Sequence, residues 1–124
     1  MYVDTNVLIR LATNDIPQLA AEADRLLSAC RPRSVIVDNT VVEEATFVLQ
    51  KYDKYLLPRE TITEVMKVVL GRDELVVDTA VFGALAMFAA HPKLDFVDCL
   101  LAVKAGGKRG KLLTFDTELQ SVLR

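Results

Sequence analysis

The sequence predicts an α/β fold in which short strands of a parallel sheet alternate with longer helices. Short β-like runs recur along the 124 residues, and segments with apolar residues at helical spacing separate them. The chain is also 52% hydrophobic with only 5 Gly and 4 Pro, a composition typical of an ordered globular protein. At this length we expect one domain spanning residues 1–124.

Capping and helix-breaking residues indicate where the predicted elements begin and end. Pro17 suits the first turn of a helix, and Asp38-Asn39-Thr40 supplies N-cap side chains for a later one. Asp78 or Thr79 is expected to cap the apolar helix that follows, which His91-Pro92 ends. Strands are expected at Met1–Asp4, Ser34–Val37, Leu75–Val77 and Lys111–Phe115, and helices at Thr5–Leu11, from Pro17 to the break at Arg31-Pro32-Arg33, Val41–Lys51, Pro58–Gly71, Ala80–Ala90, Asp95–Ala105 and after Asp116.

Composition narrows the class of protein but not its partners. The net charge of −2 neither indicates nor excludes a nucleic-acid partner, because binding depends on local patches. Cys30 and Cys99 show no metal-ligand spacing, which favours a reduced, cytoplasmic protein. No signal peptide is visible, and the apolar run Ala80–Ala90 is far shorter than the roughly 20 residues that span a bilayer, so no membrane association is expected.

Two aspartates follow predicted strands. Asp4 comes after the first strand and Asp116 after the strand that ends at Phe115. Parallel strands present such residues at one edge of the sheet, where α/β folds build their ligand sites. The structural alternative for each is an ordinary surface acid after a strand.

Two adjacent glutamates lie on the predicted helix Val41–Lys51. Glu44 has Val41, Ala45 and Val48 as helical neighbours and borders the apolar face, whereas Glu43 lies in a more polar sector. An acid on the core-facing side is rarely left without a partner, so Glu44 is the better functional candidate and Glu43 the alternative. The structural explanation is a salt bridge to Lys51 or Arg59.

A further acidic pair occurs in Asp95-Phe96-Val97-Asp98. Asp95 comes first and is expected to be the N-cap of the helix behind it. Asp98 lies one turn inside, where we expect no capping role, so a ligand role explains it better. Asp95 remains the alternative acid.

Several carboxylates in one pocket repel one another unless cations are present. Oxygen ligands select hard ions such as Mg²⁺ or Mn²⁺, and the chemistry that this arrangement suits is phosphoryl transfer from a phosphodiester. No other nucleophile system is apparent: the sequence has no GxSxG motif and no Cys/His pair, and the single histidine, His91, precedes a helix-ending proline. The basic loop Lys104–Lys111 lacks the Walker spacing and is expected to be a solvated loop, with a phosphate contact as the alternative.

Four motifs in order resemble those of the PIN-domain nucleases, over essentially the whole chain. They are Asp4-Thr5-Asn6, Glu44 with Leu49 five residues later, Asp95-Phe96-Val97-Asp98 with Leu100-Leu101-Ala102 behind it, and Leu113-Thr114-Phe115-Asp116. Within the family the chain looks like the toxin of a VapBC toxin–antitoxin system. The resemblance implies a three-layer α/β/α fold with a central parallel sheet.

The resemblance also implies an activity and its residues. The family's acidic quartet falls on Asp4, Glu44, Asp98 and Asp116, with Asn6 and Thr114 in supporting polar positions. The implied protein is a Mg²⁺-dependent (or Mn²⁺-dependent) endoribonuclease that acts on RNA, forms a homodimer and is inhibited by a cognate antitoxin.

Two other functions remain open at this point. One is a degenerate PIN domain that binds RNA or a protein without catalysis. The other is a phosphatase or phosphotransfer domain with Asp4 as nucleophile; dehalogenase-like phosphatases would have a second aspartate where this chain has Asn6, and a receiver domain would have an acidic pair where this chain has one acid.

Overall fold

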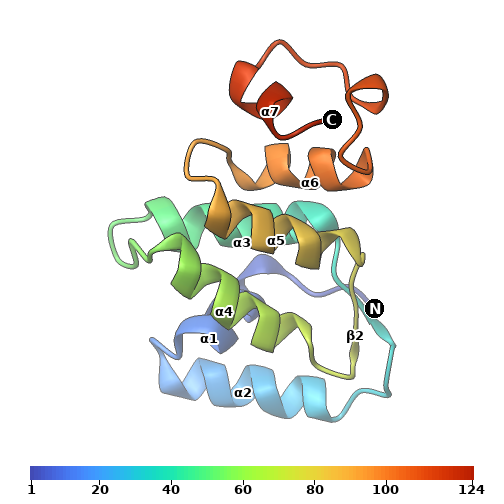
Figure 1. The fold of residues 1–124 in the computed structure, drawn as a ribbon. Helices are drawn as coiled ribbons and strands as arrows, with labels where there is room; N and C mark the ends of the chain where they lie inside the picture. The colour runs from blue at the N-terminus through green and yellow to red at the C-terminus, as the bar shows by residue number, and fades with distance from the viewer. The chain divides into compact units, whose positions relative to one another are not determined.

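The computed structural model describes all 124 residues and divides them into two compact units, Met1–Asp78 and Thr79–Arg124. The first unit contains α1 to α4, β1 and β2, and the second contains α5 to α7 and one 3₁₀ turn, η1 (Figure 1). The elements are α1 Thr5–Thr13, α2 Pro17–Ser28, β1 Val35–Ile36, α3 Asn39–Lys51, α4 Arg59–Leu70, β2 Leu75–Val76, α5 Ala80–Ala90, α6 Phe96–Lys104, η1 Arg109–Lys111 and α7 Thr117–Ser121.

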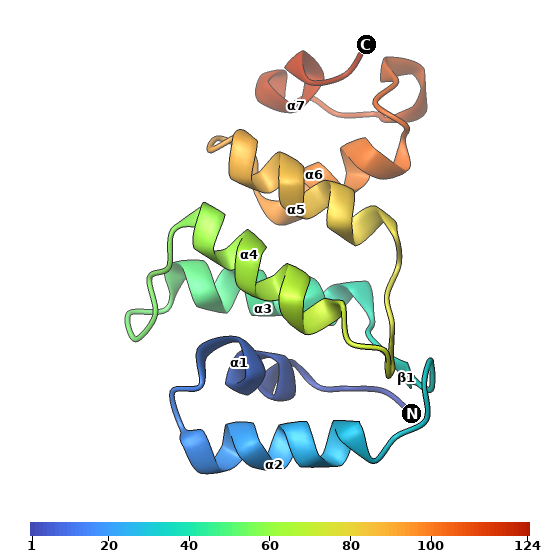
Figure 2. The ribbon, with the colours of Figure 1, turned by 60° about the horizontal axis from the view of Figure 1, so that its bottom comes forward.

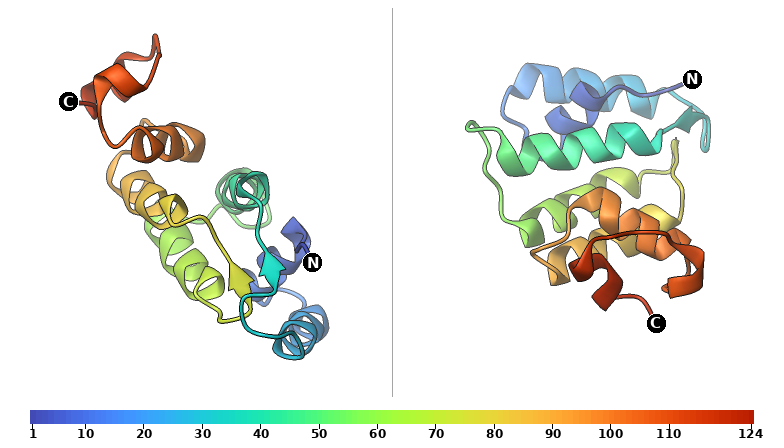
Figure 3. Two further views of the ribbon diagram at one scale, coloured as in Figure 1. Left: turned by 90° about the vertical axis from the view of Figure 1, so that its right-hand side faces the viewer. Right: turned by 90° about the horizontal axis from the view of Figure 1, so that it is seen from above.

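The first unit contains a small parallel sheet. β1 and β2 run side by side (Figure 3, left) in a register that pairs Val35 with Leu75 and Ile36 with Val76. The N-terminal segment adds a parallel bridge between Tyr2 and Ile36. Parallel pairing and the α/β class are therefore confirmed, although each strand is shorter than predicted.

The helices of the first unit enclose its core. α1 packs against α2, α3 and α4, and α3 packs against α4 (Figure 2). Leu8 on α1 and Leu49 on α3 are fully buried, as are Ile62 and Met66 on α4. Burying such side chains contributes roughly 1.5–3 kcal/mol each, which holds α1 and α3 in fixed positions.

The second unit is built around α5 and α6. Phe88 and Phe96 contact each other edge to face, with ring centroids 6.4 Å apart. Gly83 lies so close to α6 that a Cβ there would be 3.3 Å from the Val103 side chain. α5 is the apolar helix of the sequence, and Thr79 stands at its N-cap position without a side-chain capping bond. No helix in either unit is both long and apolar enough to cross a membrane.

The predicted strand Lys111–Phe115 is wrong. Lys111 ends the turn η1, and residues 112–116 form no regular structure. The backbone bonds near this segment go elsewhere: Arg109 N–H donates to the carbonyl of Arg124, and Arg124 N–H donates to that of Gly107. A strand needs a partner strand for its hydrogen bonds, and none pairs here. As a result, Phe115 is 95% exposed.

Candidate active site

Asp4 is held at the junction between the N-terminal segment and α1. Val3 N–H donates to the Ile36 carbonyl, and Ile36 N–H donates to the Met1 carbonyl, so the preceding backbone is fixed against β1. Asp4 is the N-cap of α1, and its Oδ1 accepts from the Thr5 amide at 2.7 Å. The side chain is exposed and carries its charge at the N-terminal end of a helix, which favours an anion.

Thr5 connects Asp4 to the second predicted acid. Its Oγ1 donates to Glu44 Oε2 at 3.0 Å, although the two residues are 39 positions apart in the sequence. Thr5 is only 5% exposed, so the hydroxyl is fixed by packing as well as by the bond. The amide and the hydroxyl of one residue therefore contact both acids of the first unit.

The two adjacent glutamates of α3 differ in their contacts. Glu44 accepts from Thr5 and lines a cavity, and its partner is a neutral hydroxyl rather than the Lys51 or Arg59 considered from the sequence. Glu43 is also exposed, but only its backbone carbonyl is used, by the Thr46 hydroxyl at 2.8 Å. These contacts support Glu44 over Glu43 as the acid that accompanies Asp4.

A cavity of about 240 Å³ opens beside Glu44. It lies wholly in the first unit and combines polar atoms with apolar and aromatic surface. Tyr52 and Tyr55, from the connection after α3, lie with ring centroids 5.9 Å apart. The lining residues are Thr5, Asn6, Ile9, Arg10, Glu44, Val48, Tyr52 and Tyr55.

Asp15 anchors the wall of this cavity. Its carboxylate accepts from Tyr55 Oη at 2.7 Å and forms ion pairs with Arg10 and Lys54, both at 3.0 Å. Thr13 Oγ1 donates to it as well, at 2.9 Å. These contacts, with the Tyr55 bond the strongest, hold the pKa of Asp15 well below its usual range. Arg10 and Tyr55 are thereby fixed on the cavity wall.

In the second unit, the expectation that Asp98 has no capping role is wrong. Asp95 is the N-cap of α6, as predicted, and its Oδ1 accepts from Asp98 N–H at 2.9 Å. Asp98 Oδ2 accepts from Asp95 N–H in return, at 3.2 Å. The two form a reciprocal capping box, so Asp98 has a structural function that spacing alone did not reveal.

Asp116 is the N-cap of α7. Its Oδ1 accepts from the amides of Glu118 and Leu119. Thr114 supports it, because the Thr114 hydroxyl accepts from Asp116 N–H at 3.1 Å. Burial raises the pKa of Asp98, and the nearby carboxylates of Asp95 and Asp116 raise it further. Asp98 and Asp116 therefore lie close enough to repel each other.

The four predicted acids are divided equally between the units. Asp4 and Glu44 are connected through Thr5 in the first unit, and Asp98 and Asp116 interact in the second. Within neither unit do three or more Asp, Glu, His or Cys side chains form a group that could hold a metal ion. The structure thus brings the acids together as two pairs.

Other residues near these acids differ in how well the sequence indicated them. Asn6 lines the cavity, and the Thr114 hydroxyl accepts a hydrogen bond from Asp116 N–H. Thr5 and Tyr55 were not assigned a function. The available signals were the position of Thr5 between Asp4 and Asn6 and the spacing of Tyr52 and Tyr55. These signals did not indicate the partners, because Glu44 is about 40 residues from Thr5 and Asp15 is about 40 residues from Tyr55.

Comparison with known families assigns the chain to one of them. The PIN domain family profile matches residues 1–123, nearly the whole chain. The chain belongs to the PIN-domain family. PIN domains are generally nucleases, so this PIN domain has a nuclease-type, hydrolytic function and binds nucleic acid. No curated protein and no solved structure matches the chain.

Divalent cations are the usual cofactors of PIN nucleases, and the donor atoms here suit them. All four candidate ligands are carboxylates, the donors that hard divalent cations prefer. The pKa of Asp98 is raised first by burial and further by the carboxylates of Asp95 and Asp116, which carry the same charge. A cation would relieve that repulsion. The carboxylate donors therefore suit a divalent cation by their chemistry, although neither unit gathers three of them into one group.

Proposed function

We propose that this PIN domain is a metal-dependent endoribonuclease whose acids are Asp4, Glu44, Asp98 and Asp116. The observation that carries the proposal is the Thr5 bridge, through which one buried residue contacts both Asp4 and Glu44. This contact orients two carboxylates from distant parts of the chain. The family match over residues 1–123 supports hydrolysis of a nucleic acid as the reaction.

Each residue has a distinct task in this proposal. Asp4, Asp98 and Asp116 hold the cation, and Glu44 completes the site and positions the attacking water. When bound, Mg²⁺ would make water a stronger nucleophile and neutralise charge on the leaving oxygen. Thr5 fixes the orientation of Glu44 through its hydroxyl, and Thr114 fixes the backbone of Asp116. Asn6 adds a polar side chain at the cavity.

The biological setting that we propose is that of a type II toxin. The motifs Asp4-Thr5-Asn6 and Leu113-Thr114-Phe115-Asp116 are similar to those of VapC toxins. In this setting RNA is the substrate, a cognate antitoxin is the inhibitor and the protein acts as a homodimer in the cytoplasm, as one domain spanning residues 1–124. A neighbouring small gene for a DNA-binding protein would support the assignment.

Asp4→Asn tests the catalytic proposal directly. Asparagine caps helices about as well as aspartate, so α1 should be retained while the charge is lost. We expect cleavage of labelled RNA in Mg²⁺ to fall by more than about 100-fold, since even residues behind the ligands give 10–100-fold effects. The unfolding temperature should stay unchanged.

Asp38→Asn is the matched control. Asp38 is the N-cap of α3, and its carboxylate accepts from the Thr40 amide and hydroxyl. It carries the same charge at the same kind of position but lies outside the proposed quartet. We expect full cleavage from this variant. Metal-dependent cleavage that survives Asp4→Asn would contradict the proposed site.

The capping contacts favour one alternative function. Asp4, Asp98 and Asp116 each accept a backbone amide at a helix N-terminus, so a PIN domain that only binds RNA or protein would still use them. Titration calorimetry with Mg²⁺ and Mn²⁺ distinguishes the two. Heat of binding in the wild type that is lost in Asp4→Asn supports the nuclease, and no heat in either supports the binding module. A phosphate label trapped on Asp4 would instead support the phosphotransfer alternative.

A further inference from the structure

The basic loop of the second unit forms a cavity of its own. It encloses about 470 Å³ between the C-terminal end of α6 and the turn η1. Lys104, Lys108 and Lys111 line it, and no acidic residue does. Leu101, Ala105 and Leu112 supply an apolar floor, with Gly106 between them. A loop that was expected to be merely solvated therefore has a concave, strongly basic surface.

The backbone around this cavity is fixed by hydrogen bonds. The amides of Gly106 and Gly107 donate to the carbonyls of Val103 and Ala102, which closes the end of α6. Both glycines have positive φ values, 65° and 70°, that other residues rarely adopt. Arg124 pairs with both Gly107 and Arg109 through its backbone. The three lysines therefore project from a defined frame.

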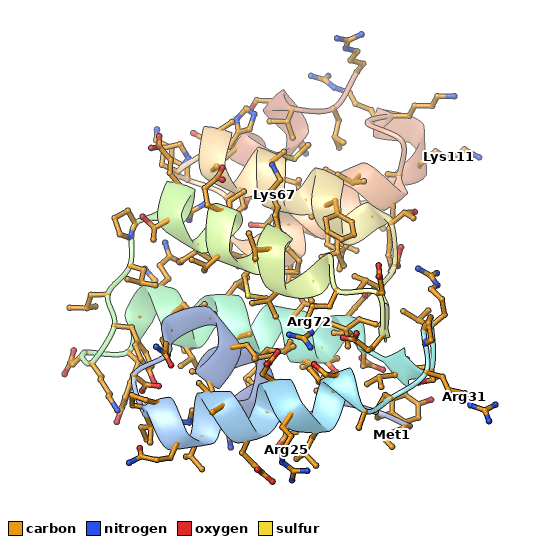
Figure 4. All side chains as sticks on the ribbon, turned by 90° about the horizontal axis from the view of Figure 1, so that it is seen from below. Met1, Arg25, Arg31, Lys67, Arg72 and Lys111 are labelled. Atoms are coloured by element: carbon orange, nitrogen blue, oxygen red, sulfur yellow. The ribbon has the colours of Figure 1, made fainter.

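Two of the lysines that line the cavity are not neutralised by an ion pair. Lys108 and Lys111 take part in none of the ion pairs of the structure, and Lys111 extends into solvent in Figure 4. The whole second unit is net positive, although the chain is net negative. Its charged residues are Lys93, Lys104, Lys108, Arg109, Lys111 and Arg124 against Asp95, Asp98, Asp116 and Glu118.

The lining chemistry suits phosphate as the ligand. Lysine binds phosphate as a mobile point charge, without the planar, bidentate geometry that arginine offers to carboxylates and phosphates alike. All three cations that line the cavity are lysines. No aromatic ring lines it, so base stacking is absent and contact with a sugar–phosphate backbone remains.

The cavity also lies at a useful distance from Asp98 in the same unit. Asp98 is in the first turn of α6 and Lys104 is its last residue. Six residues of α-helix advance about 9 Å, which is within the reach of a few nucleotides of extended single strand. An RNA that approaches Asp98 can therefore place a neighbouring phosphate among the lysines.

We propose that the cavity lined by Lys104, Lys108 and Lys111 binds backbone phosphates of a single-stranded RNA. It contributes affinity without reading the sequence, because its groups contact phosphate and not base edges. The inference rests on the proposed ribonuclease function for its ligand, but binding and cleavage are measured separately.

The test combines a triple variant with a salt titration. Lys104→Gln, Lys108→Gln and Lys111→Gln are introduced together in Asp4→Asn protein, so that the RNA is not cut. Affinity for a fluorescein-labelled single-stranded RNA is measured by anisotropy in EDTA at several salt concentrations. Each phosphate contact adds about 0.7 to the slope of log affinity against log salt. We expect the slope to fall by about 2.

Two controls separate the cavity from net charge and from folding. Arg31→Gln, Arg33→Gln and Lys67→Gln remove the same charge from exposed positions of the first unit and should leave the slope unchanged. Replacing the three cavity lysines by arginine should retain it, since the charge remains. Circular dichroism checks that each variant is folded.

The outcomes are distinguishable. An unchanged slope in the glutamine variant overturns the proposal, as does an equal fall in the first-unit control. If the glutamine variant retains RNA affinity but loses affinity for a polyglutamate peptide, the cavity binds acidic protein segments and the proposal is overturned. If the slope falls but the wild-type protein never cleaves RNA, phosphate binding in the cavity is supported and only the nuclease function is contradicted. If the wild-type protein cleaves RNA but the slope is unchanged, the nuclease function is supported and phosphate binding in the cavity is contradicted.

Discussion

Thr5 occupies a position where a single hydroxyl group controls the geometry of a carboxylate. It is buried, and its Oγ1 donates a hydrogen bond to the Glu44 carboxylate. If Glu44 positions the attacking water, a freely rotating Glu44 would reduce the rate without affecting metal binding by Asp4. The contribution of Thr5 should therefore be separable from that of the ligands.

We predict that Thr5→Val lowers RNA cleavage by about 10–100-fold, the range found for residues that orient ligands. Valine keeps the volume but removes the hydroxyl, so the free energy of unfolding should fall by about 1 kcal/mol. Single-turnover cleavage and urea unfolding measure the two effects. Thr5→Ser retains the hydroxyl and is expected to keep most of the activity. An inactive serine variant with a fully active valine variant would contradict the role of the Thr5 hydroxyl.

At the scale of elements, Asp15 and the side chains that bind it, which we call the Asp15 cluster, connect the segment after α3 to the end of α1. Arg10 belongs to α1, and Lys54 and Tyr55 belong to the connection between α3 and α4. Because Tyr55 and Arg10 also line the cavity beside Glu44, the cluster gives that cavity its shape.

Because of this cluster, we predict that the stability of the protein depends on pH. The pKa of Asp15 is lowered in the folded protein, chiefly by the Tyr55 hydrogen bond. The carboxylate therefore contributes stability that is fully present above its usual pKa of 3.8 and is lost as the pH falls further below it. We expect Asp15→Asn to destabilise the protein at pH 7 by about 2 kcal/mol. The difference from the wild type should shrink below pH 4 in urea titrations; a constant difference would contradict the ionic contribution.

The start of α6 gives a second prediction at this scale. Asp98→Ala removes one half of the capping box and should lower stability by about 1 kcal/mol, or roughly 4 °C in unfolding temperature. Asp98→Asn keeps a hydrogen-bond acceptor and should retain most of that stability. Both should lose cleavage, because both lose the charge. An active, folded Asp98→Asn protein would show that Asp98 serves only as a cap.

The helices were predictable from the sequence, and the last strand was not. Pro17, Asp38, Gly71 and Asp95 mark helix ends by local chemistry, and the structure begins or ends helices within a residue or two of each. The run Lys111–Phe115 has strand-like composition, but strands form only with a partner that local sequence does not specify. The same holds for the candidate site: Asp4 and Asp116 could be identified from their local sequence, whereas the Thr5–Glu44 contact joins distant segments and could not.

At the scale of the whole molecule, the proposed quartet draws two acids from each compact unit. We predict that saturating Mg²⁺ stabilises the full chain, by about 2.7 kcal/mol at one hundred times its dissociation constant. Thermal unfolding with and without Mg²⁺ measures this gain. It should disappear in Asp4→Asn and equally in Asp98→Asn, but not in Asp38→Asn. A gain that survives either quartet substitution would remove that residue from the proposed ligand set.

The capping contacts of Asp4, Asp98 and Asp116 also affect how relatives of this chain should be interpreted. A lineage that lost nuclease activity would still be selected for stable helix starts, so a polar residue at these positions would persist long after catalysis had gone. Asparagine satisfies that requirement as well as aspartate does. Drift from aspartate to asparagine, rather than loss of the polar residue, is therefore the trace that an inactive descendant would leave in its sequence.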